Sequence, residues 1–348
     1  MTLAWLEDLA GRAPDHRYAG ANTKDAHAHT RTTFFVALDD GQVLAFVPQG
    51  VVKRVGADGH YGTDWEIVRL SPEAEVLGRV ELDHPHPVRA VVAHRVGETV
   101  WVFFESAADG IQPMHCRRFT VAGGGLEEID RRVLDVPIAS LRTDFEGTRA
   151  LLLTLSDAFV FELTADGPVQ TAKVRYSYPD NDKGLYFSMR AAALCGEKMV
   201  LMGTAEDDRD RSYAHLKFYG LDGAEPAVIA EKQIYNRSGF EMAWWPDDVL
   251  AFWSKAFIAF DVRTPAKPKA IGTPKLWSRI VIASVQRVGE AFVGFGTGNQ
   301  LKIVERVEGK VKKVGDVRLT TRVDGALIVG RTLWTYDARK GVAVFHGR

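Results

Sequence analysis

The chain has 348 residues, of which 46% are hydrophobic and 26% are charged, and its formal net charge at pH 7 is -1. This composition excludes a disordered chain, which would combine low hydrophobicity with high net charge. The length allows two ordinary domains or one large closed β architecture.

Residues 1–29 are expected to form a short helix followed by a strand that completes the last sheet of the protein. Leu3, Leu6 and Leu9 in "LAWLEDLAGR" have helix-like spacing. Residues 16–30 can provide the strand that the last repeat lacks. The first residues include no basic region and no long apolar stretch, so they indicate no secretory signal and favour a cytoplasmic protein.

From residue 30 onward, the chain repeats a pattern of two apolar strands joined by a tight turn. Examples are "VRAVVAHRVGETVWVFF" and "RIVIASVQRVGEAFVGFG". A more polar strand pair follows most copies, as in "QLKIVERVEGKVKKVGDVRL". The first apolar strands begin near residues 31, 88, 138, 186, 239, 279 and 322. The resulting period of about 40 to 58 residues is that of β-propeller repeats.

The most apolar stretch, residues 242–262, places fifteen apolar residues among twenty-one. Pro246, Ser254 and Asp261 help divide it into runs of four or five residues, which are too short to span a membrane. Alternation within "VLAFW" places apolar side chains on both faces of the strand. Similar sheets must therefore pack on both sides of it, and no membrane association is expected.

Residues 30–348 resemble the seven-bladed β-propeller superfamily, with WD40-like or kelch-like architecture. The resemblance implies an all-β fold in one domain, with seven four-stranded antiparallel blades; six or eight blades stay open as alternatives. The Trp-Asp dipeptide of WD40 repeats does not occur, and the inner strands lack the paired glycines of kelch repeats. No functional residue of either family can therefore be transferred to this chain.

Two histidine pairs form the one candidate metal site, comprising His27, His29, His84 and His86. Residues two apart on an extended segment point to the same side, and imidazole is a common ligand of Zn²⁺. The alternative is ordinary loop histidines, because Pro85 and Pro87 already explain an extended connection. We expect no organic cofactor, since the phosphate-binding and dinucleotide-binding motifs are absent. Cys116 and Cys195 are the only cysteines, and their spacing matches no zinc motif.

The charges are divided unevenly along the chain. Residues 263–348 contain 17 basic and 6 acidic residues, whereas residues 1–262 contain 27 basic and 39 acidic ones. We expect an acidic protein partner to bind the basic region, with Trp245 as an additional contact. The interaction residues predicted are Lys267, Lys269, Lys275, Arg279, Lys310, Lys312, Lys313 and Trp245. Nucleic acid is not expected, because the aromatic residues of this region fall mostly in inner strands.

Serine-hydrolase and metalloprotease motifs are also absent from the sequence. Together with the repeat architecture, this favours a non-catalytic propeller that acts as a docking scaffold in a larger cytosolic assembly of a bacterium. The alternative function is an enzyme that acts on a small molecule or a sugar at the central channel, with a metal bound by the histidine pairs.

Overall fold

The computed structural model describes residues 3–19, 32–55, 60–107, 112–138, 142–154, 156–176, 186–206, 212–223, 225–235, 241–245, 248–253, 257–272, 282–289, 291–296 and 298–348. These residues form two compact units. Unit 1 contains residues 1–137, 280–306 and 313–348, and unit 2 contains residues 138–279 and 307–312. Within the described ranges, no helix has the length and apolar character needed to cross a bilayer.

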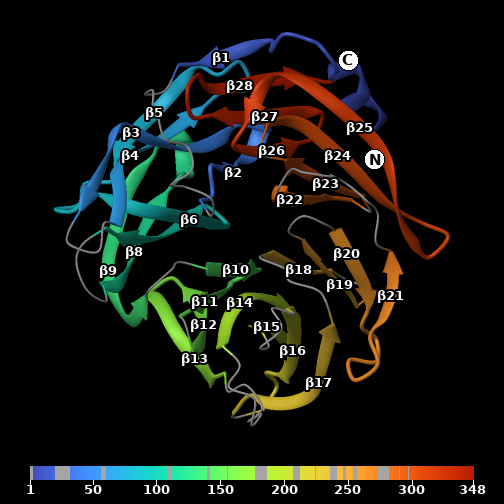
Figure 1. The fold of residues 1–348 in the computed structure, drawn as a ribbon. Coiled ribbons are helices and arrows are strands. Elements are labelled where there is room, and N and C mark those ends of the chain that lie inside the picture. The colour runs from blue at the N-terminus through green and yellow to red at the C-terminus, as the bar shows by residue number, and fades with distance from the viewer. Residues whose placement is uncertain are drawn as a thin grey trace. The chain divides into compact units, whose positions relative to one another are not determined.

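Unit 1 contains an eight-stranded sheet and two four-stranded sheets (Figure 1). The large sheet has β2 Phe35–Ala37, β3 Val43–Val55, β4 His60–Leu70, β5 Val76–Glu81, β6 Val88–Val96, β7 Thr99–Ser106, β8 Gln112–Thr120 and β9 Glu127–Ile138. The second has β22 Ile282–Val288, β23 Ala291–Gly296, β24 Gly298–Val307 and β25 Lys310–Val323. The third has β26 Gly325–Val329, β27 Thr332–Asp337, β28 Gly341–His346 and β1 His16–Tyr18.

Unit 2 contains three four-stranded antiparallel sheets, each built from consecutive strands. The first has β10 Arg142–Glu146, β11 Arg149–Leu153, β12 Asp157–Thr164 and β13 Gly167–Arg175. The second has β14 Tyr186–Cys195, β15 Lys198–Glu206, β16 Ser212–Gly220 and β17 Ala227–Tyr235. The third has β18 Glu241–Trp245, β19 Val249–Trp253, β20 Phe257–Asp261 and β21 Lys269–Gly272. These sheets are blades of the kind that a β-propeller contains.

The prediction of seven four-stranded blades is wrong, because the described residues form five such blades and one eight-stranded sheet. The two halves of the large sheet join where Thr63 of β4 pairs with Val88 of β6. Gly62 makes this approach possible, because a Cβ there would lie 2.7 Å from the Cβ of Ala107 and 3.0 Å from Pro87. Nothing in the repeat pattern signals this junction.

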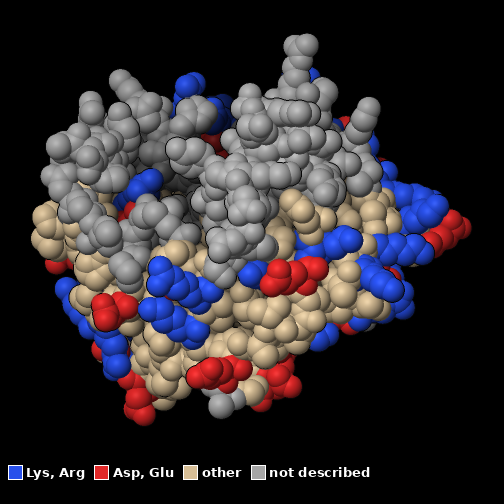
Figure 2. Space-filling model, turned by 60° about the horizontal axis from the view of Figure 1, so that its bottom comes forward, with Lys and Arg blue, Asp and Glu red and all other residues tan. Residues whose placement is uncertain are grey.

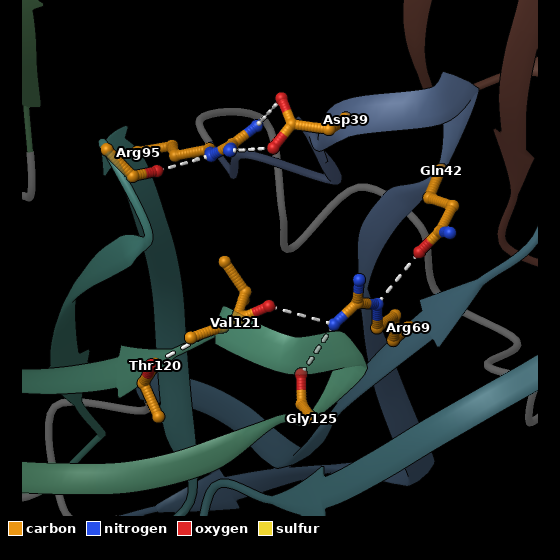
Figure 3. Close-up of polar contacts among 9 residues, drawn as sticks. Asp39, Gln42, Arg69, Arg95, Thr120, Val121 and Gly125 are labelled. Carbon is orange, nitrogen blue, oxygen red and sulfur yellow. Dashed lines mark hydrogen bonds and ion pairs between the residues drawn. The ribbon is translucent and has the colours of Figure 1, made fainter.

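Polar contacts in unit 1 also tie the two halves of the large sheet together (Figure 3). The guanidinium of Arg69 on β4 donates hydrogen bonds to the carbonyls of Val121, at 3.0 Å, and Gly125, at 2.7 Å. Its Nε donates to the side chain of Gln42 at 2.9 Å. Because Arg69 is buried, these three hydrogen bonds satisfy polar groups that water does not reach, and they hold the β8–β9 turn against β4.

The predicted N-terminal helix is instead a short 3-10 helix, η1 Ala4–Leu9. A 3-10 helix has three residues per turn, so Leu3, Leu6 and Leu9 fall on one line. All three side chains are buried and belong to a hydrophobic cluster with strands of unit 1. Their strict spacing of three therefore fits this tighter helix better than an α-helix. Two further short 3-10 helices are η3 Asp39–Gly41 and η4 Ala122–Gly124.

Burial follows strand order when the two halves of the large sheet, β2–β5 and β6–β9, are counted as four strands each. Residues of the second strand in a sheet are almost all buried, as in β7 and β11. The fourth strands alternate or are largely exposed, as in β5, β13 and β25. In four sheets, the pairing between the third and fourth strands contains a bulge in which one extra residue is unpaired. The extra residues are Leu77, Thr171, Ile229 and Ile271.

Candidate functional site

The candidate site is a groove of about 540 Å³ in unit 2, formed by β13, β16 and the start of β17. Its basic side chains are those of Lys173, Arg175 and Lys217, and its one acidic side chain is that of Glu225. We call it the basic groove. Among the described residues, the lining consists of Gln170, Thr171, Ala172, Lys173, Val174, Arg175, Lys217, Tyr219, Glu225, Pro226 and Val228.

Lys173 and Arg175 are positioned by the alternation of side chains along β13. Val174, between them, is buried, whereas both basic residues are exposed. Lys173 pairs with Phe159 across the ladder, and its Nζ lies 5.0 Å from the centre of the Phe159 ring. The two cations therefore lie on the same side of β13, at the groove. Val174, which separates them in the sequence, faces the opposite side and is buried.

Lys217 belongs to a network of buried polar side chains in the neighbouring sheet. Its Nζ lies 3.3 Å from Glu231 on β17 and 5.3 Å from the centre of the Tyr176 ring. The Tyr176 hydroxyl lies 2.7 Å from Nδ1 of His215, and Nε2 of His215 lies 3.5 Å from Glu231. Tyr176, His215 and Lys217 are all buried. The network therefore fixes Lys217 at the bottom of the groove.

Burial controls the protonation of two groups in this sheet. Removal from solvent lowers the pKa of His215, although the nearby Glu231 acts in the opposite direction. His215 is therefore neutral at pH 7. Burial raises the pKa of Tyr219 to about 12, so its hydroxyl stays protonated at pH 7. The charge of the groove thus comes from its lysine and arginine residues and from the carboxylates beside them.

A second pocket, of about 580 Å³, lies in unit 1 and has the opposite charge. Its ionisable lining consists of Asp64, Glu66, Glu81, Asp83, Arg79, Tyr18 and His84. We call it the acidic pocket. The carboxylate of Glu66 accepts a hydrogen bond from Gln49 at 3.1 Å and lies 3.4 Å from Arg79. Burial and the Glu66 charge raise the pKa of Tyr18, whose hydroxyl donates to Glu66 at 3.4 Å.

His84 lines this pocket and His86 follows it by two residues in the chain, whereas His27 and His29 fall outside the described residues. Nδ1 of His84 lies 3.0 Å from the carbonyl of His86 and 3.2 Å from its backbone nitrogen. The ring of His84 also contacts the ring of His115, with centroids 4.5 Å apart. The described ranges contain no group of three or more His, Cys, Asp or Glu arranged to hold a metal ion. The four-histidine site stays a prediction.

The predicted basic residues lie in different parts of the chain. Lys267 precedes β21, Lys269 is its first residue, and both are exposed. Lys310, Lys312 and Lys313 are exposed on β25, where Nζ of Lys312 lies 3.7 Å from Glu308 and Nζ of Lys313 lies 3.4 Å from Asp316. Lys275 and Arg279 lie outside the described residues, as does the side chain of Trp245 on β18.

Acidic side chains lie among the basic ones in the space-filling view of the described surface (Figure 2). Consistent with this, Lys312 and Lys313 each have a nearby carboxylate. The charges of Lys312 and Lys313 are thus partly neutralised by neighbouring carboxylates.

The sequence analysis missed Lys173, Arg175 and Lys217, although one signal was available. The segments "HCRRF" on β8 and "HLKFY" on β16 share the pattern His, any residue, basic, any residue, aromatic. In both strands the basic residue is buried and pairs with a glutamate of the next strand, Glu128 for Arg117 and Glu231 for Lys217. A comparison of the third strands of the repeats would therefore have identified Lys217 as a candidate.

No protein-family model and no curated protein sequence matches this chain. Solved structures match it across most of its length. A chain of the COPII outer coat vertex on membranes has a TM-score of 0.61 at 8% identity, covering 91% of this chain and 84% of that one. Sqt1 from Chaetomium thermophilum has a TM-score of 0.56 at 13% identity, covering 97% and 100%. BamB from Moraxella catarrhalis has a TM-score of 0.52 at 11% identity, covering 90% and 95%.

At such low identities these similarities describe the fold and nothing more specific. They agree with the four-stranded antiparallel blades described above and with the small amount of helix. The chain is therefore similar in fold to these structures, and it is an all-β propeller.

Proposed function

We propose that this protein is a non-catalytic scaffold that binds an acidic protein partner within a larger cytosolic assembly. The fold is compatible with this role, and one of the similar structures is part of the assembled COPII coat. The proposal extends that kind of role to this chain, whereas the propeller fold itself serves both binding proteins and enzymes.

The observation that carries the proposal is the position of the exposed large apolar side chains. In the described part of the chain, those exposed by 39% to 62% all lie on the fourth strand of a four-stranded sheet or of one half of the large sheet. They are Val76, Leu77, Ile129, Val133, Val169, Val228, Ile229 and Val314. Exposed apolar groups beside charged ones are the composition from which protein interfaces are built.

A second feature of the fourth strands favours side-chain contacts over strand addition. The bulges at Leu77, Thr171, Ile229 and Ile271 interrupt the ladder at the outer edge. Bulges at sheet edges oppose pairing with another strand. A partner would therefore be recognised through the apolar and charged side chains that these strands present.

The test is purification of the tagged full-length protein from its host at 0.1 M and 1 M salt, with mass spectrometry of the co-purifying proteins. We expect a stoichiometric acidic partner at low salt and much less of it at high salt, because exposed charges are screened over about 10 Å at 0.1 M. The double variant Lys269→Glu, Lys310→Glu should reduce its recovery. Absence of any stoichiometric partner at both salt concentrations would contradict the scaffold function.

A further inference from the structure

We propose that the basic groove binds an extended acidic segment of a protein partner. This inference rests on the scaffold function and adds the place and the chemistry of the contact. The described lining of the groove includes three basic side chains and one acidic side chain. Glu231 lies beside Lys217 outside this lining, so the cations available to a ligand are chiefly Lys173 and Arg175.

The spacing of Lys173 and Arg175 favours an extended ligand. The two residues are separated by one residue on β13, so their Cα atoms lie about 7 Å apart on the same side of the strand. Carboxylates at alternate positions of an extended peptide have the same spacing. Glutamates in the pattern Glu-x-Glu can therefore pair with both cations at once, one carboxylate to each cation.

The strand geometry explains why side chains would carry this recognition. Thr171 is the extra residue of the bulge in β13, and its hydroxyl donates to the carbonyl of Val160 at 3.2 Å. On the other side of the groove, β17 contains a bulge at Ile229. These irregularities interrupt a regular ladder along the groove. The exposed Val228, at 51%, offers an apolar contact next to the charges.

Nucleic acid fits the groove less well than an acidic peptide. Binding of single strands combines basic groups with exposed aromatic rings on which the bases stack. Among the described residues that line the groove, the one aromatic side chain is that of Tyr219, which is only 4% exposed. The described lining therefore offers partners for anionic groups and no exposed ring for stacking.

The experiment measures fluorescence anisotropy of a labelled peptide, (Glu-Ser)₄, titrated with the full-length protein at 50 mM salt. The matched peptide (Gln-Ser)₄ has the same length and lacks the charge. We expect binding of the acidic peptide and at least tenfold weaker binding of the neutral one. Equal binding of the two peptides would overturn the proposal.

The variant Lys173→Glu, Arg175→Glu should weaken binding of (Glu-Ser)₄ at least tenfold, and the neutral variant Lys173→Gln, Arg175→Gln should weaken it less. The matched control is Arg339→Glu, Lys340→Glu, which reverses the same number of positive charges in the exposed turn between β27 and β28. An equal loss in the control would show that overall charge, not the groove, governs binding. Melting curves test whether each variant is folded. If the Glu variant does not fold, the Gln variant is used to test the groove.

Two competitors separate the other anionic ligands. Ten millimolar inorganic phosphate and an eight-nucleotide deoxythymidine strand should each displace the peptide poorly. Displacement at a lower concentration of the oligonucleotide than of unlabelled peptide would replace the proposal with nucleic-acid binding. If the groove variant still recovers the partner from the host, the groove proposal fails while the scaffold function stands.

Discussion

The third strands β8 in unit 1 and β16 in unit 2 use the same residue pattern in two electrostatic settings. His115, Arg117 and Phe119 on β8 correspond to His215, Lys217 and Tyr219 on β16. In both strands the basic group lies over an aromatic ring, 5.4 Å from Phe104 for Arg117 and 5.3 Å from Tyr176 for Lys217.

The difference between the two strands lies in what surrounds the histidine and the cation. His115 has His84, His86 and Arg117 around it, and each of them disfavours its protonation. His215 instead has Glu231 and Tyr176 as partners. Arg117 also donates to the backbone carbonyl of Asp83, in addition to Glu128. The basic residue is thus buried at the same position of both strands, whereas residues of the neighbouring segments determine which groups compensate its charge.

The largest expected effect comes from Glu231→Ala, which removes the carboxylate beside the buried Lys217. Removing one partner of a fully buried pair costs about 3 to 5 kcal/mol, and the partial exposure of Glu231 reduces this to about 2 kcal/mol. Urea unfolding measures the loss. The control Glu225→Ala lies at the same groove and should have almost no effect. Equal losses in the two variants would remove the role given to the Lys217–Glu231 pair.

On β8, the corresponding variant is Glu128→Ala, which should cost less, about 1 kcal/mol, in the same measurement. Arg117 would keep the carbonyl of Asp83 as an acceptor, and its guanidinium has more donors than an ammonium group. A loss larger than that of Glu231→Ala would show that the backbone carbonyl does not compensate the Arg117 charge.

The third prediction concerns pH. Burial, together with His84 and Arg117, lowers the pKa of His115 from 6.5 to about 4. The unfolded chain therefore binds more protons than the folded one between these values, so the stabilisation present above pH 6.5 falls as the pH drops toward 4. Because His115 is half-buried and solvent screens part of the interaction, we expect a contribution of about 1 kcal/mol.

The variant His115→Phe keeps a ring beside Phe104 and removes the titrating group. Its free energy of unfolding should fall less steeply between pH 6.5 and 4 than that of the wild type. His215→Phe is the comparison on β16, where the change in slope should be smaller because Glu231 opposes the shift in pKa. If the two variants had the same slope as the wild type, the proposed difference between the strands would be wrong.

Much of the fold could be predicted because the hydrophobic pattern of each strand indicates which of its side chains are buried. The apolar runs that become β7 and β11 are continuous, and the polar alternation of β25 is visible in the sequence. The eight-stranded sheet could not be predicted in this way. It depends on the close approach of Gly62 to Pro87 and Ala107, a contact between segments that no local pattern connects.

The basic groove was harder to predict for a similar reason. Lys173 and Lys217 come from adjacent sheets and are 44 positions apart in the sequence. The excess of basic residues in 263–348 predicted an interaction surface there instead. In the structure, Lys312 and Lys313 of that region lie near carboxylates. The predicted metal site and interaction residues stay predictions, and His27, His29, Lys275 and Arg279 lie outside the described residues.

The pairing of β1 with β28 constrains how the protein is made. His16, Arg17 and Tyr18 pair with residues more than 320 positions later, and Arg12 donates to the carbonyl of His346. During translation, β1 leaves the ribosome long before β28 exists. Its sheet cannot be completed until synthesis has passed residue 346, so β1 must stay unpaired with β28 throughout the intervening elongation.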